Sequence, residues 1–97
     1  MTTRRVVITG IGAVTPLSST IEGTWKKLIK SESGLGRITI FDPTESPCKI
    51  AGEVKMGDGP DLFNPDQYIE PKEQRKMGRF IHFGVAAADQ AIADSRL

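Results

Sequence analysis

The first apolar run of the chain, Val6–Ile8, places three β-branched side chains in succession with no polar residue between them. A strand covered on both faces has this pattern, whereas a strand with one face in water alternates apolar and polar residues. Gly10 and Gly12 follow, and Pro16 ends the run. The pattern predicts a buried strand followed by a turn in which the two glycines permit tight packing or positive φ.

A helix is predicted next, beginning near Ser19. Ser19 and Glu22 have the spacing of a capping box, in which two side chains satisfy free amides of the first turn. Apolar residues then recur at helical spacing, at Ile21, Trp25, Leu28 and Ile29. We expect the face that carries Trp25 to be buried, and Gly34 and Gly36 to stop the helix.

The middle of the chain contains most of its prolines and is expected to be largely irregular. Residues 38–47 are predicted to form an ordered connection, and residues 50–54 a short strand. In the segment that follows, Asn64 precedes Pro65, a pair that favours one short capped helical turn.

Residues 72–94 form the last and longest predicted element, a helix. Two neighbouring apolar stripes follow it, Ile81, Val85, Ala88 and Ile92 in one and Phe80, Phe83, Ala87 and Ala91 in the other. They leave only a narrow polar seam through His82, so we expect most of the circumference to be buried. The small residues Gly84 and Ala86–Ala88 would let another backbone approach closely. Such a helix needs partners on more sides than these 97 residues supply.

Composition and charge exclude several classes of protein. The chain has 97 residues, of which 38% are hydrophobic and 26% charged, as in an ordinary globular domain. Its net charge of +1 gives no indication of nucleic-acid binding. The single Cys48 excludes an internal disulfide, and the apolar run after Arg5 is too short for a signal peptide or a membrane span. We therefore expect a cytoplasmic protein that binds neither nucleic acid nor membrane.

No residue of the chain is predicted to be catalytic or to bind a metal. A nucleophilic thiol needs a helix amino terminus or a cationic partner, and Lys49, next to Cys48, points the other way along an extended chain. His82 has no second ligand at suitable spacing except Asp89, which favours a solvated or hydrogen-bonded structural histidine. The dispersed aspartates are predicted to form turns, and they are Asp42, Asp58, Asp61 and Asp66.

The glycine-rich turn after the first strand has a competing interpretation as a dinucleotide-binding turn. In such turns glycines let backbone amides reach a pyrophosphate. Gly10 and Gly12 fit this pattern, but Thr15 occupies the third glycine position and Pro16 follows it. Nucleotide binding stays open as a minor alternative, and the structural turn is the main prediction.

Several sequence blocks, taken together and in their order, resemble the amino-terminal part of the β-ketoacyl-acyl carrier protein synthases, in particular the type II elongating enzymes of bacterial fatty-acid synthesis. Each block alone is a weak signal. The blocks are Arg4–Ser18, Thr24-Trp25, Ser33–Gly36 leading to Phe41-Asp42, Ile50–Val54, and Pro71–Met77 before Phe80. One departure is Gly78, where many relatives carry an acidic residue. Because glycine inside a helix costs about 1 kcal/mol relative to alanine, Gly78 puts the continuity of the last helix in question.

The resemblance implies an α/β, thiolase-like fold with two similar halves stacked in five layers, usually dimeric. Residues 1–97 would be an incomplete portion of the amino-terminal domain: its first strand, first helix and the start of the core helix layer. The family condenses an acyl thioester with malonyl carrier protein, using a cysteine, two histidines and a lysine. In this family those residues lie beyond Leu97. The resemblance therefore implies that these 97 residues alone are inactive, and it implies no cofactor or metal.

One functional surface is expected within these residues. Lys72, Arg75, Lys76 and Arg79 share a face if residues 72–79 are helical. The resemblance places these positions near the mouth of the family's substrate tunnel, so we expect Lys72, Arg75 and Lys76 to dock the acidic acyl carrier protein. An ordinary solvated helix face is the alternative. Besides an acyltransferase fragment, a small non-enzymatic module that binds acyl carrier protein stays open.

Overall fold

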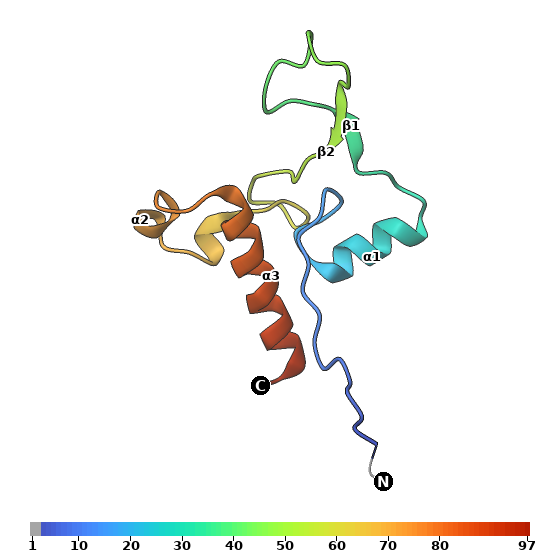
Figure 1. Cartoon of the computed structure of the whole chain (residues 1–97), viewed down its shortest axis with the longest axis vertical. Coiled ribbons are helices and arrows are strands. Elements are labelled where there is room, and N and C mark those ends of the chain that lie inside the picture. Colours follow the sequence, from blue (N-terminus) through green and yellow to red (C-terminus); the bar gives the residue numbers. More distant parts are fainter. Residues whose placement is uncertain (1–2) are drawn as a thin grey trace.

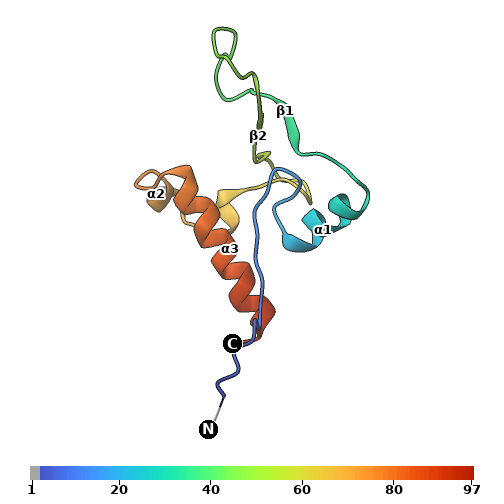
Figure 2. The same cartoon turned by 45° about the vertical axis from the view of Figure 1, so that its right-hand side comes forward.

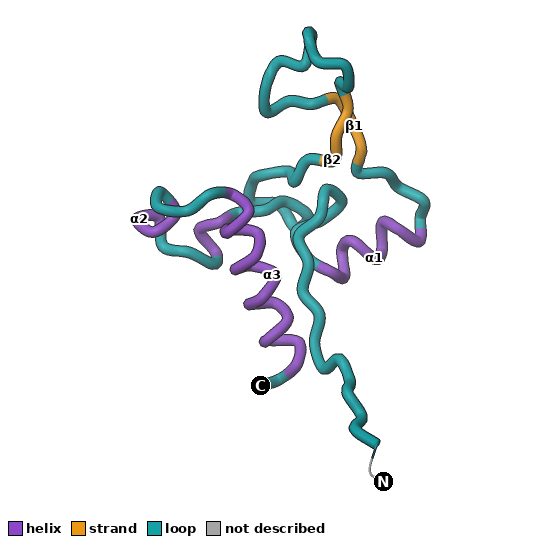
Figure 3. The backbone as a smooth tube through the Cα atoms, in the orientation of Figure 1, coloured by secondary structure: helices purple, strands orange, loops and turns teal. Residues whose placement is uncertain are grey.

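The computed structural model describes residues 3–97 and arranges them around the extended amino-terminal segment, between α1 and α3 (Figure 1). The elements in chain order are α1 (Ile21–Ile29), β1 (Leu35–Arg37), β2 (Ile50–Gly52), a short 3₁₀ turn η1 (Pro65–Gln67), α2 (Pro71–Gln74) and α3 (Arg79–Ser95). Loops connect them over long stretches, and the β1–β2 hairpin projects from one end (Figure 3). The molecule measures 60 × 37 × 28 Å. None of the helices described is long and apolar enough to cross a membrane.

The amino-terminal segment departs from the prediction. Val6–Ile8 form no strand, and Val6 is 93% exposed. A strand requires a neighbouring backbone with which to exchange hydrogen bonds, and no segment within residues 3–97 pairs with this one. In Figure 2 the dark-blue start of the chain projects beyond the carboxyl end of α3, and the chain runs alongside that helix from Gly10 onwards. The prediction of a buried strand is therefore wrong for the chain as described.

Gly10 and Gly12 let this segment lie directly on the backbone of α3. A Cβ added at Gly12 would overlap the carbonyl oxygen of Ala87, and one at Gly10 would overlap that of Ala91. The amide of Ile11 donates to Asp94 Oδ2 (3.0 Å). The prediction that the glycines permit tight packing is confirmed. The expected close approach of another backbone to the small residues of the last helix is also confirmed, because Gly12 lies against Ala87.

The helix α1 is confirmed, but its cap and its buried face differ from the prediction. The cap is Thr20, whose hydroxyl accepts a hydrogen bond from the amide of Gly23 (3.1 Å). The buried side is polar: its buried residue is Thr24, whose hydroxyl forms a 2.8 Å hydrogen bond with that of Thr15. Trp25 is 62% exposed, since no described element covers that face, so its expected burial is wrong for the described residues. The helix ends through Ser31, at φ 61°, and not at a glycine.

The two short strands form an antiparallel hairpin in which Leu35 pairs with Gly52 and Arg37 with Ile50. The second strand confirms the strand predicted over residues 50–54, although it ends at Gly52. The first lies where Gly34 and Gly36 were expected only to stop the preceding helix. Its three residues carry no alternation of apolar and polar side chains, and therefore give no strand signal.

The predicted helix over residues 72–94 is two helices, α2 and α3, with Gly78 as the amino-terminal cap of the second. The doubt that Gly78 raised is thus confirmed. Only His82 and Ala86 of α3 are buried, and Phe80 is 78% exposed. The prediction that most of the helix is buried is wrong for the described residues, because they cover one side of it only.

The small core lies where α3 meets the segment after the hairpin. Phe63 is 1% exposed, and its ring meets the edge of Phe83 with centroids 5.1 Å apart. The 3₁₀ turn closes this core as predicted: the side chain of Asn64 caps it by accepting a hydrogen bond from the amide of Asp66 (3.0 Å).

Candidate functional site

The three predicted docking residues lie on α2 and the turn after it, and all are exposed. Lys72 is in the helix, Arg75 is the carboxyl-terminal cap that follows it, and Lys76 comes next. Arg79 belongs to α3, so the prediction that all four cations share the face of one helix is wrong. The reason is the break in the helix between residues 75 and 78.

A buried histidine ties α2 to the rest of the molecule. His82 Nε2 lies 3.2 Å from the carbonyl oxygen of Gln74, the last residue of α2. The side-chain amide of Gln74 donates to the carbonyl of Ile69 (2.9 Å) and to Asp66 (2.7 Å). The prediction of a hydrogen-bonded structural histidine is confirmed, and its effect is to hold the basic segment on the core.

The predicted docking cluster, which consists of Lys72, Arg75 and Lys76, keeps most of its positive charge. Its single ion pair among the residues described joins Lys76 to Glu73 at 3.5 Å, with both side chains largely in water. An exposed pair of this kind stabilises by at most about 1 kcal/mol, so a partner readily replaces it. Lys72 and Arg75 make no ion pair within residues 3–97.

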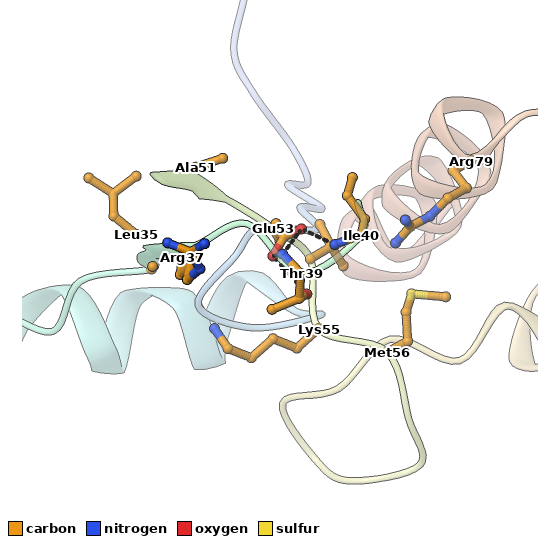
Figure 4. Close-up of a pocket in the computed structure, with 12 residues that line it drawn as sticks. Leu35, Arg37, Thr39, Ile40, Ala51, Glu53, Lys55, Met56 and Arg79 are labelled. Carbon is orange, nitrogen blue, oxygen red and sulfur yellow. Dashed lines mark hydrogen bonds between the residues drawn. The ribbon is translucent and has the colours of Figure 1, made fainter. Parts of the chain in front are cut away.

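A cavity of about 490 Å³ lies between the hairpin, the strand-like segment after it and the start of α3 (Figure 4). Its walls include apolar side chains such as Leu35, Ile40 and Met56. Arg37, Lys55 and Arg79 also line it. Sequence reasoning missed this cavity, because three segments separated along the chain form it and none of them signals on its own that it lines a cavity.

The carboxylate of Glu53 holds one wall of this cavity together. It accepts hydrogen bonds from the amide of Thr39 (3.0 Å), from the Thr39 hydroxyl (3.0 Å) and from the amide of Ile40 (3.1 Å). Desolvation raises the pKa of Glu53, but these hydrogen bonds and the charge of Arg79 together outweigh it, so the pKa lies below its ordinary value. Glu53 is therefore ionised at neutral pH and ties the chain after the first strand to the chain after the second.

Cys48 and the aspartates take structural places. Cys48 is exposed, and its thiol lies 3.2 Å from the carbonyl oxygen of Ile50. Asp42 forms the predicted turn with Thr44, whose hydroxyl and amide lower the pKa of the carboxyl group. In Asp61 a hydrogen bond with Ser18 lowers the pKa, desolvation opposes it, and the 3.3 Å ion pair with Lys27 lowers it further. No set of three metal-ligating side chains gathers anywhere in residues 3–97.

Two amides of the glycine-rich turn are already used within the chain. The amide of Ile11 donates to Asp94, and that of Ala13 donates to Gln90 Oε1 (3.3 Å). Because α3 covers one face of Gly10 and Gly12, a pyrophosphate has no room on that face. The geometry argues against the nucleotide-binding alternative.

Comparison with known proteins gives one consistent family. The family model described as "Beta-ketoacyl synthase, N-terminal domain" matches residues 3–97. The chain is 46% identical over 93 residues to a 3-oxoacyl-[acyl-carrier-protein] synthase 2 of Rhizobium meliloti, covering 95% of this chain and 22% of that protein. It is 42% identical over 94 residues to the enzyme of the same name from Synechocystis, covering 97% of this chain and 21% of that protein.

A solved structure agrees with these sequences. It is titled "The ishigamide ketosynthase/chain length factor", and it matches with a TM-score of 0.79 at 31% identity over 99% of this chain and 22% of that one. The chain thus spans about a fifth of the length of the relatives it matches. The arrangement of the described residues is that of part of a ketosynthase.

Proposed function

Because the chain belongs to the β-ketoacyl synthase family and lies within its amino-terminal domain, with the corresponding part of the thiolase-like fold, we propose that it acts as part of a 3-oxoacyl-acyl carrier protein synthase. The reaction would be the elongation of a fatty acid by decarboxylative condensation of an acyl thioester with malonyl carrier protein. The observation that supports it most strongly is the 42–46% identity to enzymes of that name over nearly the whole chain.

These residues would contribute scaffold and recognition, while the chemistry takes place elsewhere in the enzyme. A thioester-forming nucleophile needs an activating base or a helix amino terminus. The exposed Cys48 lies in a loop, and His82 is engaged with Gln74. We therefore propose that none of the 97 residues performs the acyl transfer.

We further propose that Lys72, Arg75 and Lys76 dock the acyl carrier protein. Their exposure, the lack of a carboxylate partner for Lys72 and Arg75 among the described residues, and the anchoring of α2 by His82 support this. Clustered cations on a fixed segment attract an acidic partner and orient it as it approaches. A homodimer of the complete enzyme and a cytoplasmic location stay predictions.

A chimeric synthase tests the proposed activity. The matched 93 residues of the Rhizobium meliloti enzyme are replaced by those of this chain, and condensation of an acyl thioester with malonyl carrier protein is measured. We expect the chimera to condense, because the family fold should accept a segment with this identity. A chimera that folds, as judged by circular dichroism, yet fails to condense would contradict the proposal. The same chimera with the active-site cysteine of the recipient enzyme replaced serves as the blank.

A further inference from the structure

Positive charge continues from the docking cluster onto the rim of the cavity beside the hairpin. Three cations line this cavity: Arg37, Lys55 and Arg79. The carboxylate among its lining residues is that of Glu53, whose oxygens accept three hydrogen bonds from Thr39 and Ile40. No ion pair within residues 3–97 neutralises any of the three cations.

Arg79 is the cation of this rim that is best placed to receive a partner. Its side chain is exposed and extends from the start of α3 towards Ile40 and Glu53 (Figure 4). The guanidinium carbon lies 5.5 Å from the centre of the Phe83 ring, and that ring packs against buried Phe63. A guanidinium held over an aromatic ring loses less side-chain freedom when it binds.

Arg79 is also close enough to the docking cluster to act with it. Four residues of chain span at most about 14 Å, so the backbone of Arg79 lies within that distance of Arg75. Charges act over about 30 Å at 10 mM salt and about 8 Å at physiological salt. At low salt the electrostatic potentials of the cations near α2 and of Arg79 therefore add together where a protein approaches.

We infer that Arg79 extends the docking surface of Lys72, Arg75 and Lys76 across to the rim of the cavity, where it binds a carboxylate of the acyl carrier protein. The inference rests on the proposed function. A carboxylate is the fitting group because the planar guanidinium fork donates two parallel hydrogen bonds to its two oxygens. Glu53 accepts hydrogen bonds from Thr39 and Ile40 and forms no ion pair with Arg79 among the described residues, so the guanidinium donors of Arg79 can take the partner's carboxylate.

The test measures the dissociation constant for acyl carrier protein of the full chain, and in parallel the KM of the chimeric synthase for the same protein. We expect Arg79→Glu to raise both the dissociation constant and the KM about fivefold or more at 10 mM salt, and much less at physiological salt. Arg79→Lys should keep most of the affinity because it keeps the charge. Arg96→Glu is the matched control, since it makes the same change in charge at the far end of the same helix, about 25 Å away, and should have a small effect.

The double variant Arg75→Glu/Lys76→Glu separates this inference from the proposed docking. If the double variant weakens binding and Arg79→Glu behaves like Arg96→Glu, the docking surface stands and the inference about Arg79 is overturned. If neither Arg79→Glu nor the double variant has an effect, both are overturned. An effect of Arg79→Glu alone would also overturn the inference, because Arg79 would then extend no surface on α2. Circular dichroism of each variant excludes loss of fold as the cause.

Discussion

Substitution of Gly12 by alanine should destabilise the chain, because this glycine is where the extended amino-terminal segment touches α3. The added methyl group would overlap the carbonyl oxygen of Ala87 and lie 2.8 Å from the amide nitrogen of Ala91. Those atoms belong to a helix backbone and cannot swing aside, so the segment itself must move away. Its movement would break the hydrogen bond from Ala13 to Gln90, whose own amide donates to Ser19 at 2.7 Å.

The size of this effect follows from two contributions. Forcing a methyl group into a well-packed contact costs about 1–3 kcal/mol, and each lost hydrogen bond adds about 0.5–1.5 kcal/mol. We expect a loss of about 2–4 kcal/mol, which in a chain of this size lowers the melting temperature by about 8 °C or more. Thermal unfolding followed by circular dichroism measures it.

Gly84 provides the matched control in the same helix. No atom lies within 4 Å of the position that its Cβ would take. Alanine there should stabilise the helix by about 0.5–1 kcal/mol, because glycine is a poor helix former. If Gly12→Ala melts at or above the temperature of the unmodified chain, the packing of the segment on α3 is refuted.

Three further predictions follow from other contacts. Trp25→Ala should change the free energy of unfolding by less than about 1 kcal/mol, because the side chain is exposed, and a larger loss in urea titration would show a covered face. The pKa of Glu53 lies below its unfolded value, so its contribution to stability is present above pH of about 4.3 and is lost as the pH falls through the folded pKa. Amide exchange at Thr39 and Ile40 should accelerate in that range, and rates that follow only the intrinsic pH dependence would contradict the role of Glu53. The 97 residues alone should release no carbon dioxide from malonyl carrier protein, and measurable release would contradict this. They should also self-associate in sedimentation, because the apolar side chains of Phe80, Ile92 and Trp25 are exposed. A monodisperse monomer would contradict that expectation.

Several local signals in the sequence predicted local structure, although the cap and the end of α1 were predicted wrongly. Asn64 before Pro65 gave the capped turn, and Gly78 indicated the point at which the last helix breaks. Gly10 and Gly12 indicated a tight approach, although not to which partner. In each case the physical cause lies within a few residues, in a cap, a fixed φ or a missing side chain.

Burial was predicted poorly, because it depends on what lies opposite. The apolar run Val6–Ile8 and the face of Trp25 have the composition of buried surfaces, yet nothing within residues 3–97 covers them. The cavity beside the hairpin escaped prediction for the related reason that Glu53 and Arg79 come together only in the fold. Periodicity reports which face of an element is apolar, and it does not report whether a partner is present.

The proposed docking of an acyl carrier protein rests on the basic segment formed by Lys72, Arg75 and Lys76. Its most direct test is the KM of the chimeric synthase for acyl carrier protein with Arg75→Glu and Lys76→Glu together, at 10 mM and at physiological salt, beside transfer from a small uncharged thioester. The account predicts a strongly raised KM at low salt, a much smaller rise at physiological salt and unchanged transfer from the small thioester, because screening shortens the reach of these charges from about 30 Å to about 8 Å. An unchanged KM at low salt would contradict it and leave the cluster an ordinary solvated surface.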